Sequence, residues 1–179
     1  HGNFPDPRAI ERAKRLGVAF DIQPAWLHLD GAAIKDVFGP ERMKNFQPLR
    51  SMLDAGLVVA GGSDHMIRFD SREATNPYHP FFGMWMAVTR KTTDGKVLNP
   101  EERISRMEAL KMWTWNAAYL MFAEKETGSI EPGKLADMVV ISKDFATCPE
   151  DDIKDIEPVE TIVGGKVVYQ RSAAAVSGR

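Results

Sequence analysis

The spacing of apolar and polar residues predicts alternating helices and strands in the first part of the chain. An amphipathic pattern over 7–16, begun by an Asp-Pro pair and ended by a glycine, predicts a short helix, and the stretch 18–23 predicts a strand. Loop signals fill 25–47, an amphipathic helix follows over 48–55, and the β-branched run 57–60 predicts a strand buried on both faces. This succession is typical of βα units around a parallel sheet.

Beyond the second predicted strand the pattern becomes irregular before it turns helical again. Residues 66–80 are rich in charge and contain two X-Pro pairs, which predicts a long loop, and a long loop inside a compact domain is more often functional than idle. The apolar stretch 81–90 predicts a helix. A Pro-Glu-Glu start followed by a one-sided apolar pattern predicts a longer helix over 100–122.

From residue 128 onward the sequence is typical of a small β-sheet. Glycine-rich turn residues precede a predicted strand over 136–141, and two further strands are predicted over 160–163 and 166–169. Gly164 and Gly165 between the last two predict a tight hairpin turn. The small and polar residues of 171–179 predict a disordered tail.

Composition excludes several classes of protein. The 179 residues suffice for the core of one ordinary domain, and 44% hydrophobic with 27% charged residues is typical of a globular protein. A net charge of −2 gives no electrostatic reason to expect nucleic acid or a membrane as a partner, and no apolar stretch is long enough to span a bilayer. The single cysteine, Cys148, excludes an intrachain disulfide and a cysteine-cluster metal site.

The stretch LVVAGGSDH at 57–65 holds the best candidate for a catalytic group. Asp64 follows a predicted buried strand, and in parallel α/β sheets catalytic groups lie at the carboxyl ends of the strands. Gly61 and Gly62 allow a sharp turn or a close approach where a Cβ would clash. The local sequence also fits an alternative, in which Asp64 only caps the next segment.

Several motifs together resemble the C-terminal part of the amidohydrolase superfamily. They are GGSDHM at 61–66, EALKMWTWNAAYLM at 108–121, GSIEPGKLADMVVI at 128–141 and TIVGGKVVY at 161–169, and they match in order and spacing. QPAW at 23–26 resembles a strand end in the YtcJ-like branch, amidohydrolase family 3. The resemblance covers nearly the whole chain.

The resemblance implies an α/β fold with two parts. Residues 1–127 correspond to the C-terminal portion of the (β/α)8 TIM barrel of a metal-dependent hydrolase. Residues 128–170 correspond to the small composite β-sandwich domain beside that barrel, and 171–179 form the tail.

The resemblance also implies roles for individual residues. Asp64 matches the aspartate that ends the eighth barrel strand, binds one divalent metal ion and, as general base, takes a proton from the water that the metal activates. His1 matches the histidine that closes the sixth strand, a second metal ligand, although a terminal histidine is also found in tags. His65, Arg90 and His28 are candidates for binding the substrate. For Arg90 the alternative is charge complementarity at a helix C-terminus, and for His28 it is a solvated loop position.

The chain departs from the family in what it lacks. The His-x-His pair of the first strand, the metal-bridging residue and the fifth-strand histidine have no counterpart, whereas a catalytic zinc takes about three protein ligands. We therefore expect an incomplete portion of an enzyme, whose partner is the missing N-terminal barrel portion and which holds metal weakly when alone. Homo-oligomerisation is left open. So is localisation, with the cytoplasm favoured, since a leader before His1 could be missing.

These implications predict a metal-dependent hydrolase of small-molecule substrates that cleaves a C–N bond other than a peptide bond, in an amide or cyclic amide. The expected cofactor is a divalent metal, zinc, with one or two ions in the complete enzyme. The alternative is a non-catalytic truncated paralogue that acts as a binding or regulatory module.

Overall fold

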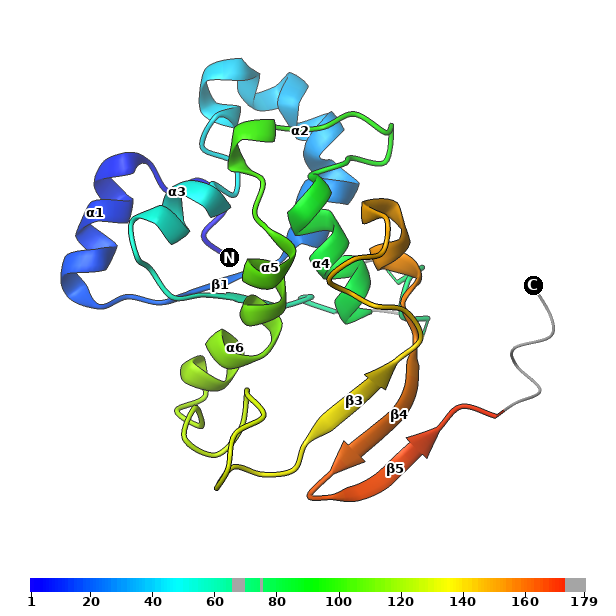
Figure 1. Cartoon of the computed structure of the whole chain (residues 1–179). Coiled ribbons are helices and arrows are strands. Elements are labelled where there is room, and N and C mark those ends of the chain that lie inside the picture. Colours follow the sequence, from blue (N-terminus) through cyan, green and yellow to red (C-terminus); the bar gives the residue numbers. More distant parts are fainter. Residues whose placement is uncertain (66–69, 75, 173–179) are drawn as a thin grey trace.

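The computed structural model describes residues 1–65, 70–74 and 76–172. Part of the predicted loop 66–80 and most of the predicted tail 171–179 lie outside the described residues. A short parallel sheet lies among helices, and a separate antiparallel sheet forms one end of the molecule (Figure 1). The elements are α1 (Pro7–Leu16), β1 (Phe20–Ile22), α2 (Pro24–Met43), α3 (Leu49–Asp54), β2 (Val59–Gly61), α4 (Pro80–Thr89), η1 (Pro100–Glu102), α5 (Arg106–Trp113), α6 (Trp115–Leu120), β3 (Met138–Ile141), η2 (Glu150–Asp155), β4 (Pro158–Val163) and β5 (Lys166–Gln170).

The two strands predicted in the first part of the chain pair with each other in parallel. Phe20 lies opposite Val59, and Ile22 lies opposite Gly61. This pairing confirms the prediction of a parallel sheet. Because parallel strands end at the same edge, the residues that follow Ile22 and Gly61 lie close together.

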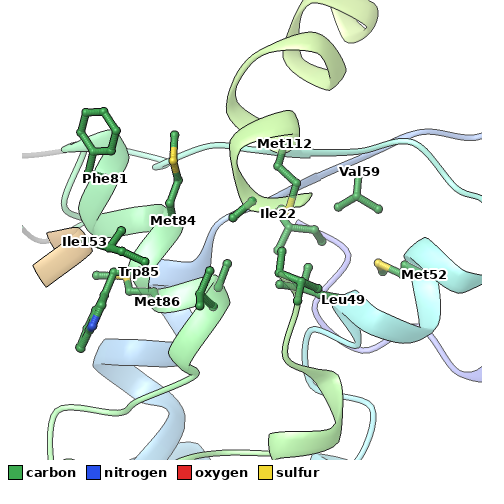
Figure 2. Packing of buried hydrophobic residues seen from close by; sticks show 14 of the residues in the cluster. Ile22, Leu49, Met52, Val59, Phe81, Met84, Trp85, Met86, Met112 and Ile153 are labelled. Atoms are coloured by element: carbon green, nitrogen blue, oxygen red, sulfur yellow. The ribbon is translucent and has the colours of Figure 1, made fainter. Parts of the chain in front are cut away.

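The core packs around this strand pair. Ile22 and Val59 are fully buried, and Figure 2 shows them close to Met112 of α5 and to side chains of α3. Helix α4 is buried along almost its whole length, and Ile153 of η2 belongs to the same buried cluster. The segment before β4 is thus anchored to the helices by apolar contact.

The prediction of a loop over 25–47 was wrong, because α2 occupies most of this range. Gly31 lies inside this helix, where the absence of a side chain makes room for neighbouring residues. A Cβ at this position would lie 3.0 Å from the Thr92 side chain and 3.1 Å from that of Leu98. Gly39, with φ +73°, produces a kink that lets the following proline fit. These residues serve packing and bending, which their identity alone does not reveal.

The predicted single helix over 100–122 is divided into η1, α5 and α6. Ser105 caps α5, because its hydroxyl accepts from the Glu108 main-chain nitrogen while the Glu108 carboxylate accepts from that of Ser105. Thr114, at φ −122° and ψ −92°, separates α5 from α6. The helical spacing of apolar residues continues through the breaks between η1 and α5 and between α5 and α6. The spacing therefore did not reveal either break.

The ion pair between Arg50 and Glu108 should make the stability of the fold depend on pH. Arg50 donates to both of its oxygens, at 2.9 and 2.7 Å, and this lowers the pKa of Glu108 from 4.5 to about 2. A lowered folded-state pKa gives stability that is fully present above pH 4.5 and is lost as the pH falls toward 2. We expect Glu108→Gln to cost about 1–2 kcal/mol of unfolding free energy at pH 7 and much less near pH 3. Urea unfolding at both pH values measures this. The exposed control Glu126→Gln should change neither value, and an equal loss for Glu108→Gln at both would contradict the assignment.

The C-terminal strands form a small antiparallel sheet in the order β3-β4-β5 (Figure 1). Met138 lies opposite Ile162, and Thr161 lies opposite Tyr169. Gly164 and Gly165, with φ of +57° and +77°, form the turn between β4 and β5. The predicted strands and hairpin are confirmed. In the described part of the chain, no helix is long and apolar enough to cross a membrane.

Candidate active site

Asp64 lies just beyond the carboxyl end of β2, as predicted. Its backbone has φ +52°, a conformation that residues other than glycine rarely adopt. The side-chain amide of Asn76, which is almost fully buried, donates to the Asp64 main-chain oxygen at 2.7 Å. The Asp64 side chain is 34% exposed. Asn76 therefore holds the backbone while the carboxylate stays accessible.

His1 lies at the same edge of the sheet as Asp64. Its Nε2 is 3.8 Å from Asp64 Oδ2, and its side chain is 51% exposed. The two residues that the resemblance identifies as metal ligands thus lie side by side near the carboxyl end of β2. Two ligands held at ~2.1 Å by one tetrahedral zinc ion lie ~3.4 Å apart. The observed separation therefore fits two ligands of one metal ion.

The two glycines before Asp64 are explained by side chains packed against them. A Cβ on Gly61 would lie 2.5 Å from the Trp113 ring, and a Cβ on Gly62 would lie 2.7 Å from Asp21 Oδ1. Neither glycine has a positive φ. Of the two roles considered from the sequence, close approach is the one observed.

Two polar residues of the first predicted strand also reach the site, and sequence reasoning missed them. Gln23 Oε1 is 2.6 Å from His1 Nδ1, and Gln23 Nε2 donates to Asp21 Oδ2 at 2.8 Å. Burial raises the pKa of Asp21, the nearby Asp64 charge adds to the rise, and the hydrogen bond from Gln23 opposes it. The available signal was the pair of polar residues at alternate positions of an otherwise apolar strand.

The remaining predicted substrate contacts lie in different surroundings. His28 Nδ1 is 2.7 Å from the Lys91 main-chain oxygen, and its ring packs edge-on against Phe82 and Trp85. This placement is that of a packed residue rather than a solvated one. His65 follows Asp64 directly, is exposed, and has its ring centroid 4.4 Å from that of Tyr78.

Arg90 is fully buried at the end of α4. Its guanidinium donates to the main-chain oxygens of Leu98, Gln47 and Phe46, at 2.7, 2.9 and 2.9 Å. Burial lowers its pKa to about 10, so it stays charged at neutral pH. These contacts argue for a structural role of Arg90 and against the expected contact with substrate. Each nitrogen of its guanidinium already donates to a main-chain oxygen.

The loop that carries Asn76 is tied to the C-terminal part of the chain. Arg72 forms an ion pair with Glu157 at 2.6 Å and donates to the Lys154 main-chain oxygen at 3.0 Å. His79 caps α4 by accepting from the Phe82 nitrogen. Burial, followed by the Arg72 charge, lowers the pKa of His79. Arg72 and His79 therefore anchor the described part of this loop to the C-terminal segment and to α4.

The chemistry that the site can support is limited by its number of ligands. Among the described residues, no group of three or more His, Cys, Asp or Glu side chains could hold a metal ion. His1 and Asp64 together fall short of the three protein ligands of a catalytic zinc site. A cavity of about 610 Å³ lies elsewhere, between the α5–α6 helices and β3; its lining is mostly apolar and contains none of the predicted site residues.

Several known proteins resemble this chain in sequence or in fold. YtcJ of Bacillus subtilis is 31% identical over 96% of this chain and 32% of its own length. The N-substituted formamide deformylase of Arthrobacter pascens is 37% identical over 75% of this chain and 23% of its own. The structure of a metal-dependent hydrolase from Pyrococcus horikoshii OT3 shares the fold, with a TM-score of 0.71 at 22% identity over 84% of this chain and 29% of that one.

The chain spans less than a third of the length of each of these proteins. A family profile described as "Amidohydrolase family" matches residues 1–169, which is almost the entire chain. The parallel strand pair, the antiparallel C-terminal sheet and the profile agree, and this chain belongs to the amidohydrolase family.

Proposed function

We propose that the protein containing this chain is a metal-dependent hydrolase of a C–N bond in an amide or cyclic amide, with Asp64 as general base. The observation that carries the proposal is the pairing of His1 Nε2 with Asp64 Oδ2, 3.8 Å apart near the carboxyl end of β2. Membership in the amidohydrolase family supports the reaction class. The relative from Arthrobacter pascens, named a deformylase of N-substituted formamides, supports a small N-substituted amide as substrate.

In this proposal β1 and β2 are two strands of a (β/α)8 barrel, and the sheet of β3, β4 and β5 belongs to a composite β-sandwich domain. Within the described residues, β1 and β2 pair only with each other. Residues outside this chain would supply the other barrel strands. They would also supply the ligands that His1 and Asp64 do not provide.

His1 and Asp64 would hold a zinc ion, whose imidazole and carboxylate ligands they match in type and separation. Bound there, zinc would lower the pKa of the attacking water and polarise the substrate carbonyl. The Asp64 carboxylate, partly exposed, accepts the proton as the water oxygen bonds to the carbonyl carbon. It then returns the proton to the nitrogen as the C–N bond breaks, giving an acid and an amine. Asn76 holds the main chain from which this carboxylate extends.

The substrate would enter beside the exposed ring of His65. This residue follows Asp64 directly, so a group bound against it lies near the reacting atoms. An imidazole can donate a hydrogen bond to the part of the substrate that does not react.

The second candidate function is a non-catalytic module that binds or regulates. The observation that favours it is the shortage of ligands, since no cluster of three is present in the described part of the chain. The two candidates differ in the expected metal content of the full-length protein.

The test compares the full-length protein with residues 1–179 alone. We expect the full-length protein to retain at least one zinc ion per chain after dialysis and to hydrolyse members of a panel of N-substituted formamides and cyclic amides. Treatment with a chelator should abolish this activity, and zinc should restore it. The isolated chain should show neither stoichiometric zinc nor activity. A metal-free, inactive full-length protein would favour the binding module, and full activity of residues 1–179 would contradict the need for outside ligands.

A further inference from the structure

Gln23 lies between two residues of the site and contacts both with its side-chain amide. Its oxygen is 2.6 Å from His1 Nδ1, and its nitrogen donates to Asp21 Oδ2 at 2.8 Å. The residue is only 3% exposed, although it carries two polar groups. A buried amide needs partners for its polar atoms, and here both partners belong to the edge of the sheet that carries Asp64.

The chemistry of the two partners fixes the orientation of this amide. An ionised carboxylate only accepts hydrogen bonds, so the Gln23 group facing Asp21 is its NH2. The Gln23 oxygen must then face His1. That oxygen only accepts, so His1 carries its proton on Nδ1 and donates it to Gln23.

This tautomer leaves the lone pair of His1 on Nε2, the nitrogen that lies 3.8 Å from Asp64 Oδ2. The backbone of Gln23 is itself held in place. Gln47 Nε2 donates to the Gln23 main-chain oxygen at 2.9 Å, and α2 begins directly after Gln23. Histidine ligands of metal ions are commonly oriented by a partner on the other ring nitrogen. Here an amide would take that place, with a carboxylate behind it.

We propose that Gln23 is a positioning residue that holds His1 in the tautomer able to bind a metal ion through Nε2, and that Asp21 sets the direction of the Gln23 amide. This inference rests on the proposed function. It predicts that an acceptor held opposite His1 Nδ1 decides metal affinity, whereas the identity of the side chain that supplies this acceptor does not.

The test measures the zinc dissociation constant of the full-length protein by competition with a chromogenic chelator. Gln23→Leu removes both hydrogen bonds at similar side-chain volume and should weaken zinc binding about 10- to 100-fold. The double variant Asp21→Asn with Gln23→Glu moves the carboxylate next to His1 and the amide behind it. It keeps the hydrogen bond from His1 Nδ1 to residue 23 and reverses the other, since the amide at position 21 now donates to the carboxylate at 23. An acceptor still faces His1 Nδ1, so the zinc affinity should stay within about threefold of the wild type.

Glu102→Ala is the matched control, because it removes a buried polar side chain that bonds to Ser51 instead of the site. It should lower the melting temperature and leave zinc affinity unchanged. Wild-type affinity for Gln23→Leu would overturn the inference while leaving the proposed function intact, and so would a double variant as weak as Gln23→Leu. A full-length wild type that binds no zinc would instead overturn both.

Discussion

In the full-length protein, Asp64→Asn is expected to lower the turnover rate by about 10²-fold or more while leaving the fold intact. Asparagine keeps an oxygen that can bind a metal ion, but its amide does not accept a proton at neutral pH. The hydrogen bond from Asn76 goes to the main chain, so the substitution should not disturb it. The measurement is steady-state hydrolysis at saturating substrate, together with zinc content and circular dichroism.

A surface carboxylate provides the control for this substitution. Asp144 is exposed and caps a turn between β3 and η2 by accepting from the Ala146 nitrogen at 2.9 Å. Asp144→Asn should turn over at the wild-type rate. If Asp64→Asn did the same, Asp64 would be a capping residue, which was the alternative in the sequence.

The largest expected effect on stability comes from Arg90. Arg90→Met keeps the apolar stem but removes the donors to Leu98, Gln47 and Phe46. Each buried carbonyl left without a donor costs free energy, so we expect a loss of about 3 kcal/mol or more in unfolding free energy. Urea denaturation of the full-length protein measures this loss. Arg90→Lys, with one ammonium group, should fall between Arg90→Met and the wild type.

The Arg90 variants also separate a structural role from substrate binding. If Arg90 bound a group of the substrate, Arg90→Met would raise KM and leave the urea midpoint of unfolding unchanged. Arg8, whose side chain is almost fully exposed, supplies the control, and Arg8→Met should change stability by less than about 0.5 kcal/mol.

The sequence predicted those parts of the fold that local signals determine. The Asp-Pro start and glycine end gave α1, and the Gly164-Gly165 pair gave the turn between β4 and β5. It did not predict α2, because the role of Gly31 depends on Thr92 and Leu98, which are distant in sequence. The break before α5 had a local signal in Ser105-x-x-Glu108, which the longer apolar period masked.

The site was predicted only where a strand end marked it. Asp64 follows the segment that the sequence predicted as a buried strand, and the His1 side chain lies 3.8 Å from its carboxylate. Gln23 and Asn76 were missed, since each acts through a contact with a residue that is distant in the chain. Arg90 shows the opposite error, because a charged residue after an apolar helix gives no sign of the carbonyls that surround it.

The ion pair between Arg72 and Glu157 implies an order of events during synthesis on the ribosome. Lys154, whose main chain also binds Arg72, lies 82 residues further along the chain. Since a nascent chain emerges from its N-terminus, Asp64 and its loop leave the ribosome long before these partners exist. Until residue 157 has emerged, the loop that carries Asn76 lacks one of its anchors. The loop beside Asp64 therefore reaches its final structure only late in the synthesis of this chain.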